Sequence, residues 1–205
     1  MKYRKKQKQQ LEYEKLTNNH KLHPESQVVF WCDKEEQRNA FEKGGIFVGE
    51  IKTGVNKGQP VKINRVHQNS AVLVTRKEHG IQEENRLIHG VFMVKKGYIG
   101  KLSEGGFIPA HSNYKIQLSE EESKQMPLWK YYTNKKSPNK ISWNTGKYRY
   151  FDNEWMAQIL LDIYSIKTDP LEKQVVQQFL FHFCKMNNIS VEDITQPTGL
   201  LTLTK

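Results

Sequence analysis

Short apolar runs separated by polar or glycine-containing turns characterise the chain from about residue 27 to residue 118. Runs of four to eight apolar or alternating residues are typical of β-strands. They predict strands at 28–31, 46–51, 61–63, 70–75, 87–94 and 114–118. The run at 87–94 is the strongest, and Gly90 inside it predicts a β-bulge or a tight bend. Residues 53–60, TGVNKGQP, predict a turn or a flexible loop.

Helical patterns begin at recognisable capping residues. Asp33 predicts the N-cap of a helix that continues through Glu42 and ends before two glycines. Ser119 and Glu122 have the spacing of a capping box, and we expect their helix to run to about Tyr132, although Pro127 interrupts its pattern.

Two longer helices follow near the C-terminus. One begins at Asn153 and carries apolar residues on one face as far as Ile163. Asp169 followed by Pro170 is typical of an N-cap and first helical position, and the second helix extends to about Met186.

This order of elements favours an α+β protein with a small mixed or antiparallel β-barrel, flanking helices and C-terminal helices. Residues 1–24 form a basic arm, disordered or helical. Residues 25–168 form the barrel domain, and residues 169–205 form a helix and tail that we expect to pack on the barrel.

Charge changes the picture, because the 205-residue chain has a net charge of +10. Half of that excess lies in residues 1–24, which hold seven basic and two acidic side chains. A basic balance favours polyanionic partners such as DNA or RNA. The sequence contains no run of about 18 apolar residues, so it predicts no membrane-spanning helix. The two cysteines form no disulfide framework, so we expect a reduced, cytoplasmic protein.

Motifs for common chemistries are not found in the sequence. It contains no phosphate-binding Walker loop, no dinucleotide fingerprint, no C-x-x-C and no HExxH. Cys32 and Cys184 both fit core positions, and the clustered glutamates fit helix starts and turns. We therefore expect no catalytic residue, no metal and no cofactor, and an enzyme is the less favoured reading.

The segment 129–155 contains eight aromatic and six basic residues but only two acidic ones. Aromatic rings stack on bases and basic side chains neutralise phosphates, so such a segment is a candidate nucleic-acid surface. The same rings also suit the closure of a small barrel. Trp129, Tyr131 and Tyr132 are expected to pack, which leaves 143–150 as the part suited to binding.

Three short pieces are candidates for one base-binding site, and each also has a structural explanation. Trp31 either fills the barrel or faces its mouth. Trp143 is either a stacking platform or a plug at a turn. Arg149 either anchors a phosphate or forms a structural bridge to Asp152 or Asp162. The candidate binding residues are Trp31, Trp143, Asn144, Thr145, Lys147, Arg149 and Tyr150.

A resemblance rests on SAVLVT and RLIHGVFMV, which look like the central strand pair of PUA-like domains. The superfamily includes the EVE, YTH and ASCH groups, which are small β-barrels with flanking helices. The late WNTGKYRYFDNEWMAQILLDI is similar to PUA-like domains found beside bacterial defence and restriction modules. The resemblance implies that Trp31 and Trp143 are cage residues, with Asn144, Thr145 and Arg149 as polar readers.

Three functions follow as hypotheses. The favoured one is a nucleic-acid-binding module that stacks one base, in one version a modified base, and has no catalysis of its own. The second is an enzyme acting on nucleic acid or on a small anionic substrate. The third is a protein-interaction module that uses the basic arm and the C-terminal helix. The choice of DNA or RNA and any protein partner stay open.

Overall fold

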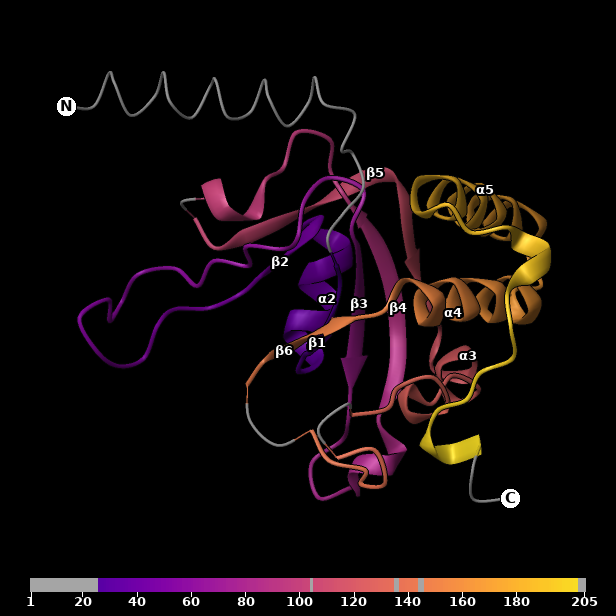
Figure 1. Ribbon diagram of the computed structural model, residues 1–205, viewed down its shortest axis with the longest axis horizontal. Coiled ribbons are helices and arrows are strands. Elements are labelled where there is room, and N and C mark those ends of the chain that lie inside the picture. Colours follow the sequence, from indigo (N-terminus) through magenta and orange to yellow (C-terminus); the bar gives the residue numbers. More distant parts are fainter. Residues whose placement is uncertain (1–25, 104, 135–136, 144–145, 203–205) are drawn as a thin grey trace.

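A curled, mixed six-stranded sheet forms the centre of the computed structural model (Figure 1). The structure describes residues 26–202 apart from 104, 135–136 and 144–145. The strand order is β2-β5-β4-β3-β1-β6, and β1 and β3 are parallel while the other pairs are antiparallel. The strands are β1 (Gln27–Trp31), β2 (Gly45–Phe47), β3 (Ala71–Arg76), β4 (Leu87–Val94), β5 (Phe107–Gln117) and β6 (Tyr148–Phe151).

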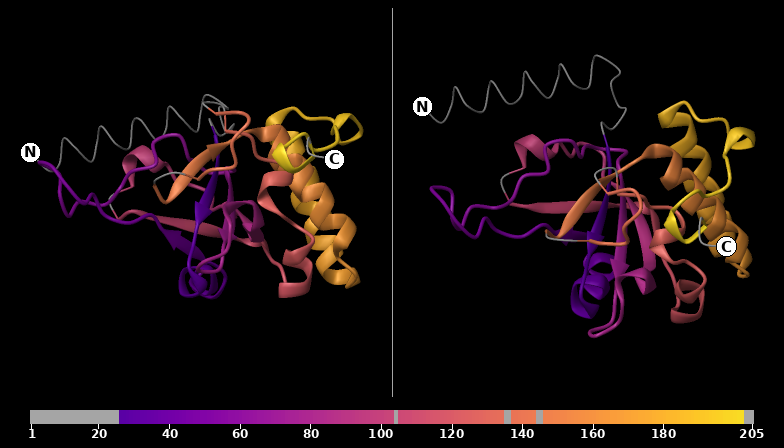
Figure 2. Two further views of the ribbon diagram at one scale, coloured as in Figure 1. Left: turned by 90° about the horizontal axis from the view of Figure 1, so that it is seen from below. Right: turned by 60° about the horizontal axis from the view of Figure 1, so that its bottom comes forward.

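Helices cover both faces of this sheet. The α-helices are α2 (Lys34–Glu42), α3 (Glu120–Lys124), α4 (Asn153–Ile166) and α5 (Pro170–Asn187). Short 3-10 turns occupy Glu83–Asn85, Gly100–Leu102, Leu128–Lys130, Val191–Asp193 and Leu200–Thr202. Figure 2 shows α4 and α5 packed side by side on one side of the sheet, with α2 on the other. No helix in the described part of the chain is long and apolar enough to cross a membrane.

Side chains along each strand point alternately to the two faces of the sheet, so the core has two separate parts. Val28 and Phe30 of β1 point into the curl of the sheet, where they pack with residues of α2. Val29, between them, points to the opposite face and packs in the cluster that includes α4 and α5. Successive strand residues point to opposite faces, so one apolar run supplies both layers. Tyr148 and Tyr150 of β6 also pack against the inner cluster.

Most of the predicted elements are confirmed, and the exceptions have local causes. The predicted N-cap at Asp33 and the predicted capping box at Ser119 both form, and Asp33 also forms a capping box with Glu36. The helix after Ser119 nevertheless ends at Lys124 instead of Tyr132, because the chain turns before Pro127 into a separate 3-10 turn. The sequence predicts a strand at 61–63, but none forms there: Val61 donates one hydrogen bond to the Gly49 carbonyl, and the neighbouring Pro60 forms an isolated bridge with Glu50.

Gly90 lies at the predicted irregularity in β4. The pairing of β3 with β4 shifts register between Val74 and Thr75, where Val74 pairs with Gly90. Gly90 has a φ of +150°, and a Cβ atom there would lie 2.4 Å from the Ile116 carbonyl oxygen and from the Phe41 ring. Only glycine fits such a close approach without displacing its neighbours. The bulge prediction is therefore confirmed.

The fold is mixed α+β, as the sequence predicts, and the sheet is a curled half-barrel with β2 and β6 as its edges. One side chain links the two edges: Lys147, just before β6, donates a hydrogen bond of 3.2 Å to the Phe47 carbonyl of β2. Helix α5 packs on β5 and α4. The basic arm, residues 1–24, lies outside the described residues.

Candidate binding cavity at the ends of strands β1 and β3

A cavity of about 730 Å³ opens where the parallel strands β1 and β3 end and α2 begins. Residues from four separate segments of the chain form its walls, which combine two indoles with charged side chains. The described lining residues are Trp31, Asp33, Glu36, Lys77, Glu83, Arg86, Trp143, Gly146 and Lys147. The volume falls within the range of small-molecule and base-sized sites in proteins.

Trp31 is the exposed wall of this cavity. It is the last residue of β1, and its backbone N–H donates to the Lys147 carbonyl at 2.8 Å, which fixes the position of its Cα atom. Its side chain is 47% exposed, in contrast to the four fully buried residues that precede it in the strand. A half-exposed indole on a rigid strand end offers one ring face to a ligand.

Trp143 is the buried wall, with 6% of its surface exposed. Its indole Nε1 donates to the Gly146 carbonyl at 2.7 Å, so its own chain satisfies the polar group. Arg149 supports it from behind: Nη2 donates to the Trp143 carbonyl at 2.5 Å, and the guanidinium carbon lies 5.3 Å from the ring centroid. The orientation of Trp143 is therefore fixed before any ligand binds.

Arg86 connects the two tryptophans and was not anticipated from the sequence. Its guanidinium carbon lies 4.6 Å from the ring centroid of Trp143 and 5.9 Å from that of Trp31. Glu83 accepts from it twice, at 2.5 Å to Nε and 2.8 Å to Nη2. The remaining nitrogen, Nη1, is buried and has no hydrogen-bond partner among the described residues. A buried donor without a partner costs about 1–3 kcal/mol, so an acceptor at this position would be stabilised.

The charged residues of the lining balance one another. Lys147 forms an ion pair with Glu36, and Arg86 pairs with Glu83. Asp33 accepts from the Glu36 backbone N–H as the N-cap of α2. Three cationic and three acidic side chains line the cavity, so its charge does not favour an anion inside it. A neutral, flat group that stacks on indole suits such walls better than a phosphate.

The structure brings three of the seven predicted binding residues to this cavity, namely Trp31, Trp143 and Lys147. Arg149 lies behind Trp143, with Nη1 donating to the Tyr148 carbonyl at 2.7 Å. Tyr150 faces the interior of the half-barrel, and the guanidinium of Arg65 lies 4.7 Å from its ring centroid. Asn144 and Thr145 lie outside the described residues.

Catalytic pairs are not found among the described lining residues, which include no histidine and no cysteine. Cys32 is 1% exposed, and burial raises the pKa of its thiol far above the ordinary value, so the reactive thiolate is disfavoured. Burial, followed by the nearby Arg76 charge, lowers the pKa of His89 to about 4. His89 bonds to the buried Ser123 hydroxyl at 3.2 Å, outside this lining. No group of metal-ligating side chains occurs in the described part of the chain.

Comparison with known proteins adds no family to this geometry: no protein family, curated protein sequence or solved structure matches the chain.

Proposed function

We propose that the protein is a nucleic-acid-binding module that accepts one base in the cavity lined by Trp31, Arg86 and Trp143, without catalysis of its own. The observation that carries the proposal is that both tryptophans, 112 residues apart in sequence, line one cavity with Arg86 over both rings. A nucleobase is flat and neutral and carries hydrogen-bond acceptors on its edge.

Each wall supplies one part of base recognition. Trp31 exposes an indole face for stacking, an interaction worth about 1–3 kcal/mol per base and tolerant of sequence. When a base binds, the Arg86 guanidinium turns toward the cavity, and its buried Nη1, which has no acceptor among the described residues, donates to a carbonyl or ring nitrogen of the base. Trp143 is held in place by its own chain and closes the inner side. A modified base is included in the proposal, because the cavity has room beyond one planar ring system.

A PUA-like fold is part of the same proposal. The two segments that carry the resemblance, β3 and β4, are antiparallel neighbours in the middle of the sheet. The curled sheet with helices on both faces supports this assignment. The net charge of +10 supports a polyanionic partner, since the phosphates of a nucleic acid would lie outside the neutral cavity.

The experiment is a fluorescence-anisotropy titration with labelled single-stranded and duplex DNA and RNA oligonucleotides at about 50 mM and about 200 mM salt. We expect binding that weakens steeply with salt. Trp31→Ala removes the stacking face and should raise Kd roughly five- to 150-fold, the equivalent of about 1–3 kcal/mol.

Phe181→Ala is the matched control. Phe181 lies on α5 and is 52% exposed, so its removal deletes a similar aromatic surface away from the cavity. It should bind like the wild-type protein. No detectable binding to any of these oligonucleotides at low salt would rule out the proposed function. Equal losses in the Trp31 and Phe181 variants would show that bases do not enter the cavity.

A further inference from the structure

The most prominent surface feature outside the cavity is a hairpin formed by residues 48–62. It leaves the body of the protein directly after β2 and extends well beyond it in every view (Figures 1 and 2). Residues 52–59 are all exposed, and Val55 is 103% exposed. No described part of the chain covers this tip.

Backbone hydrogen bonds give the hairpin a defined shape. The Ile51 N–H donates to the Gln59 carbonyl at 2.9 Å, and the Gly58 N–H returns to the Ile51 carbonyl at the same distance. The Val61 N–H donates to the Gly49 carbonyl at 2.9 Å, and Glu50 bridges to Pro60. Residues 53–60, predicted as a turn or flexible loop, form bends and turns, and hydrogen bonds between the two arms at their base make the segment a paired projection. A paired hairpin loses less conformational entropy on binding than an unpaired loop of the same length.

The charge of the hairpin is mainly positive. It carries Lys52, Lys57 and Lys62 against the single acid Glu50. These three lysines form no ion pair with any residue that the structure describes. Four lysines elsewhere form ion pairs: Lys124 with Glu121, Lys130 with Asp162, Lys147 with Glu36, and Lys167 with Glu122 and Glu172.

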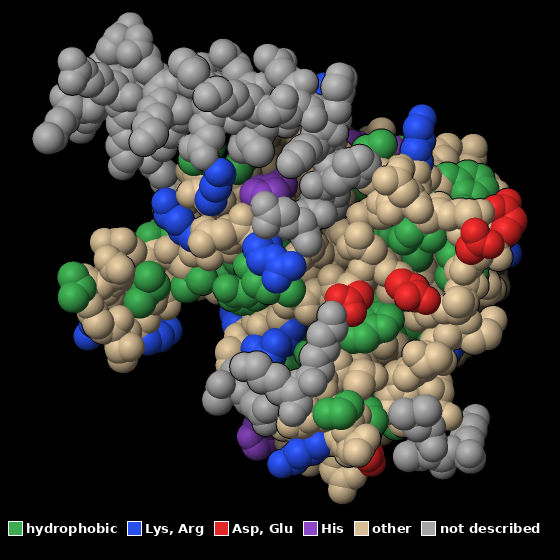
Figure 3. Space-filling model, in the orientation of Figure 1, with side chains coloured by type: hydrophobic (Ala, Val, Ile, Leu, Met, Phe, Trp, Pro, Cys, Tyr) green, Lys and Arg blue, Asp and Glu red, His purple; other side chains and the backbone are tan. Residues whose placement is uncertain are grey.

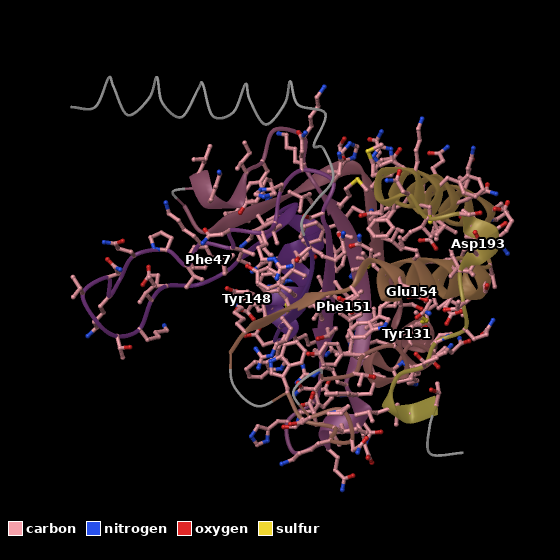
Figure 4. The ribbon with its side chains drawn as sticks, viewed as in Figure 1. Phe47, Tyr131, Tyr148, Phe151, Glu154 and Asp193 are labelled. Carbon is pink, nitrogen blue, oxygen red and sulfur yellow. The ribbon has the colours of Figure 1, made fainter. Side chains whose placement is uncertain are left out.

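Position connects the hairpin to the cavity. Its first residue, Val48, follows Phe47, whose carbonyl accepts a hydrogen bond from the Lys147 side chain that lines the cavity. In Figure 3, Lys and Arg side chains gather on and beside the hairpin, whereas Asp and Glu lie toward the α4 and α5 side of the same face. Glu154 and Asp193, labelled in Figure 4, belong to that acidic side.

We propose that hairpin 48–62 contacts the sugar–phosphate backbone of the same nucleic acid whose base enters the cavity, with Lys52 and Lys57 as phosphate contacts. The inference rests on the proposed function. The neutral cavity receives the base, and the free lysines of the projection neutralise the phosphates next to it. Val55, between these lysines at the tip, provides an apolar contact to sugars or base edges.

The test is the salt dependence of oligonucleotide binding for the double variant Lys52→Gln/Lys57→Gln. The association constant falls as salt rises, and each lost phosphate contact should make this negative slope of log K against log salt shallower by about 1. We therefore expect a slope that is shallower by about 2 and a Kd at about 100 mM salt that is roughly tenfold higher or more. The matched control is Lys173→Gln/Lys185→Gln on α5, which removes the same charge from the helix side and should keep the wild-type slope.

The outcomes separate this inference from the proposed function. If the wild-type protein binds no oligonucleotide, the proposed function fails and the hairpin inference fails with it. If Trp31→Ala weakens binding while the hairpin variant keeps the wild-type slope, only the hairpin inference is overturned. Equal slope changes in the hairpin and α5 variants would also overturn it, because they would show a net-charge effect. Thermal melts of the hairpin variant should match the wild type, since Lys52 and Lys57 are exposed. The α5 variant should melt slightly lower, because half-buried Lys173 lies 4.8 Å from the Tyr164 ring centroid.

Discussion

The tryptophans of this protein occupy two different environments, a packed core and the wall of a cavity. Trp129 and Trp155 belong to a packed aromatic cluster with Tyr132 and Phe151, in which ring centroids lie 5.3 to 5.9 Å apart. Trp31 and Trp143 instead line a cavity, and their rings are contacted by the guanidinium of Arg86. The first group fills the core between the sheet and α4, and the second borders open space.

The difference shows that aromatic density alone does not identify a binding site. Trp129 is fully buried and Trp31 is 47% exposed, although both follow short apolar segments. In the packed cluster, rings satisfy one another through edge and stacked contacts. In the cavity, the Arg86 guanidinium takes the place of a neighbouring ring, and the Trp31 indole stays partly exposed. Partner type and exposure, both tertiary properties, separate the two groups.

The largest expected effect comes from the packed group. Trp129→Ala should lower the free energy of unfolding by about 3–5 kcal/mol, because it deletes a fully buried indole. Urea unfolding followed by far-ultraviolet circular dichroism would measure it. The folded fraction of the variant should bind oligonucleotides as the wild type does. A loss below about 1 kcal/mol would contradict the assignment of Trp129 to the core.

The pH dependence of stability tests the buried histidine His89, which lies outside the cavity lining. The folded-state pKa of His89 is lowered to about 4 from an ordinary 6.5, so the folded protein holds this imidazole neutral. The unfolded chain binds more protons between these values, so stability is complete above pH 6.5 and decreases as pH falls toward 4. The decrease assigned to His89 is about 3 kcal/mol.

His89→Gln keeps a hydrogen-bonding partner for Ser123 and should remove most of this decrease between pH 6.5 and 4.5. His79→Gln, at an exposed turn position, is the control and should leave the profile unchanged. Urea midpoints measured across this range would decide. If the His89 variant keeps the wild-type dependence of stability on pH, a group other than His89 is responsible for the decrease.

A smaller effect is expected at the centre of the cavity. Arg86→Gln removes the cation from both indoles and leaves Glu83, whose side chain is 20% exposed, without its partner. We expect a loss of about 2 kcal/mol, below the 3–5 kcal/mol typical of fully buried pairs, because water reaches the carboxylate. Arg38→Gln is the control, since its ion pair with Glu42 is exposed and worth less than about 1 kcal/mol. Equal losses in the two variants would refute a structural role for the Arg86–Glu83 pair.

The smallest effect on stability should come from Trp31 itself. Trp31→Ala removes a side chain that is already half exposed, so the free energy of unfolding should fall by less than about 1 kcal/mol. Chemical denaturation beside the binding titration would show a variant that is stable but binds weakly. A stability loss above about 2 kcal/mol would instead place Trp31 with the packed group.

Local elements were predictable wherever the signal is local. The capping boxes at Asp33 and Ser119, the Pro170 helix start and the Gly90 bulge each depend on residues within a few positions of one another. The lengths of elements were less predictable. β5 extends over Phe107–Gln117, well before the expected start at Tyr114, because pairing with β2 and β4 stabilises a stretch whose own pattern is weak.

The candidate site was predicted only in part. Trp31 and Trp143 were chosen for their aromatic rings and flanking residues, and the structure places both at one cavity. Arg86 was missed because nothing around it marks it: it precedes an apolar strand and follows a polar turn, as many surface arginines do. Its burial at 2% and its contact with both rings arise from pairing between strands.

By itself the sequence determined the α+β class, the helix starts, the bulge position and the positive charge, because each depends on composition or on neighbouring residues. Only the tertiary structure decided that β1 pairs in parallel with β3, that the sheet curls, and that Trp31, Arg86 and Trp143 meet. Contacts between residues 44 or more positions apart depend on strand register and on packing across the whole core. No local pattern encodes those quantities.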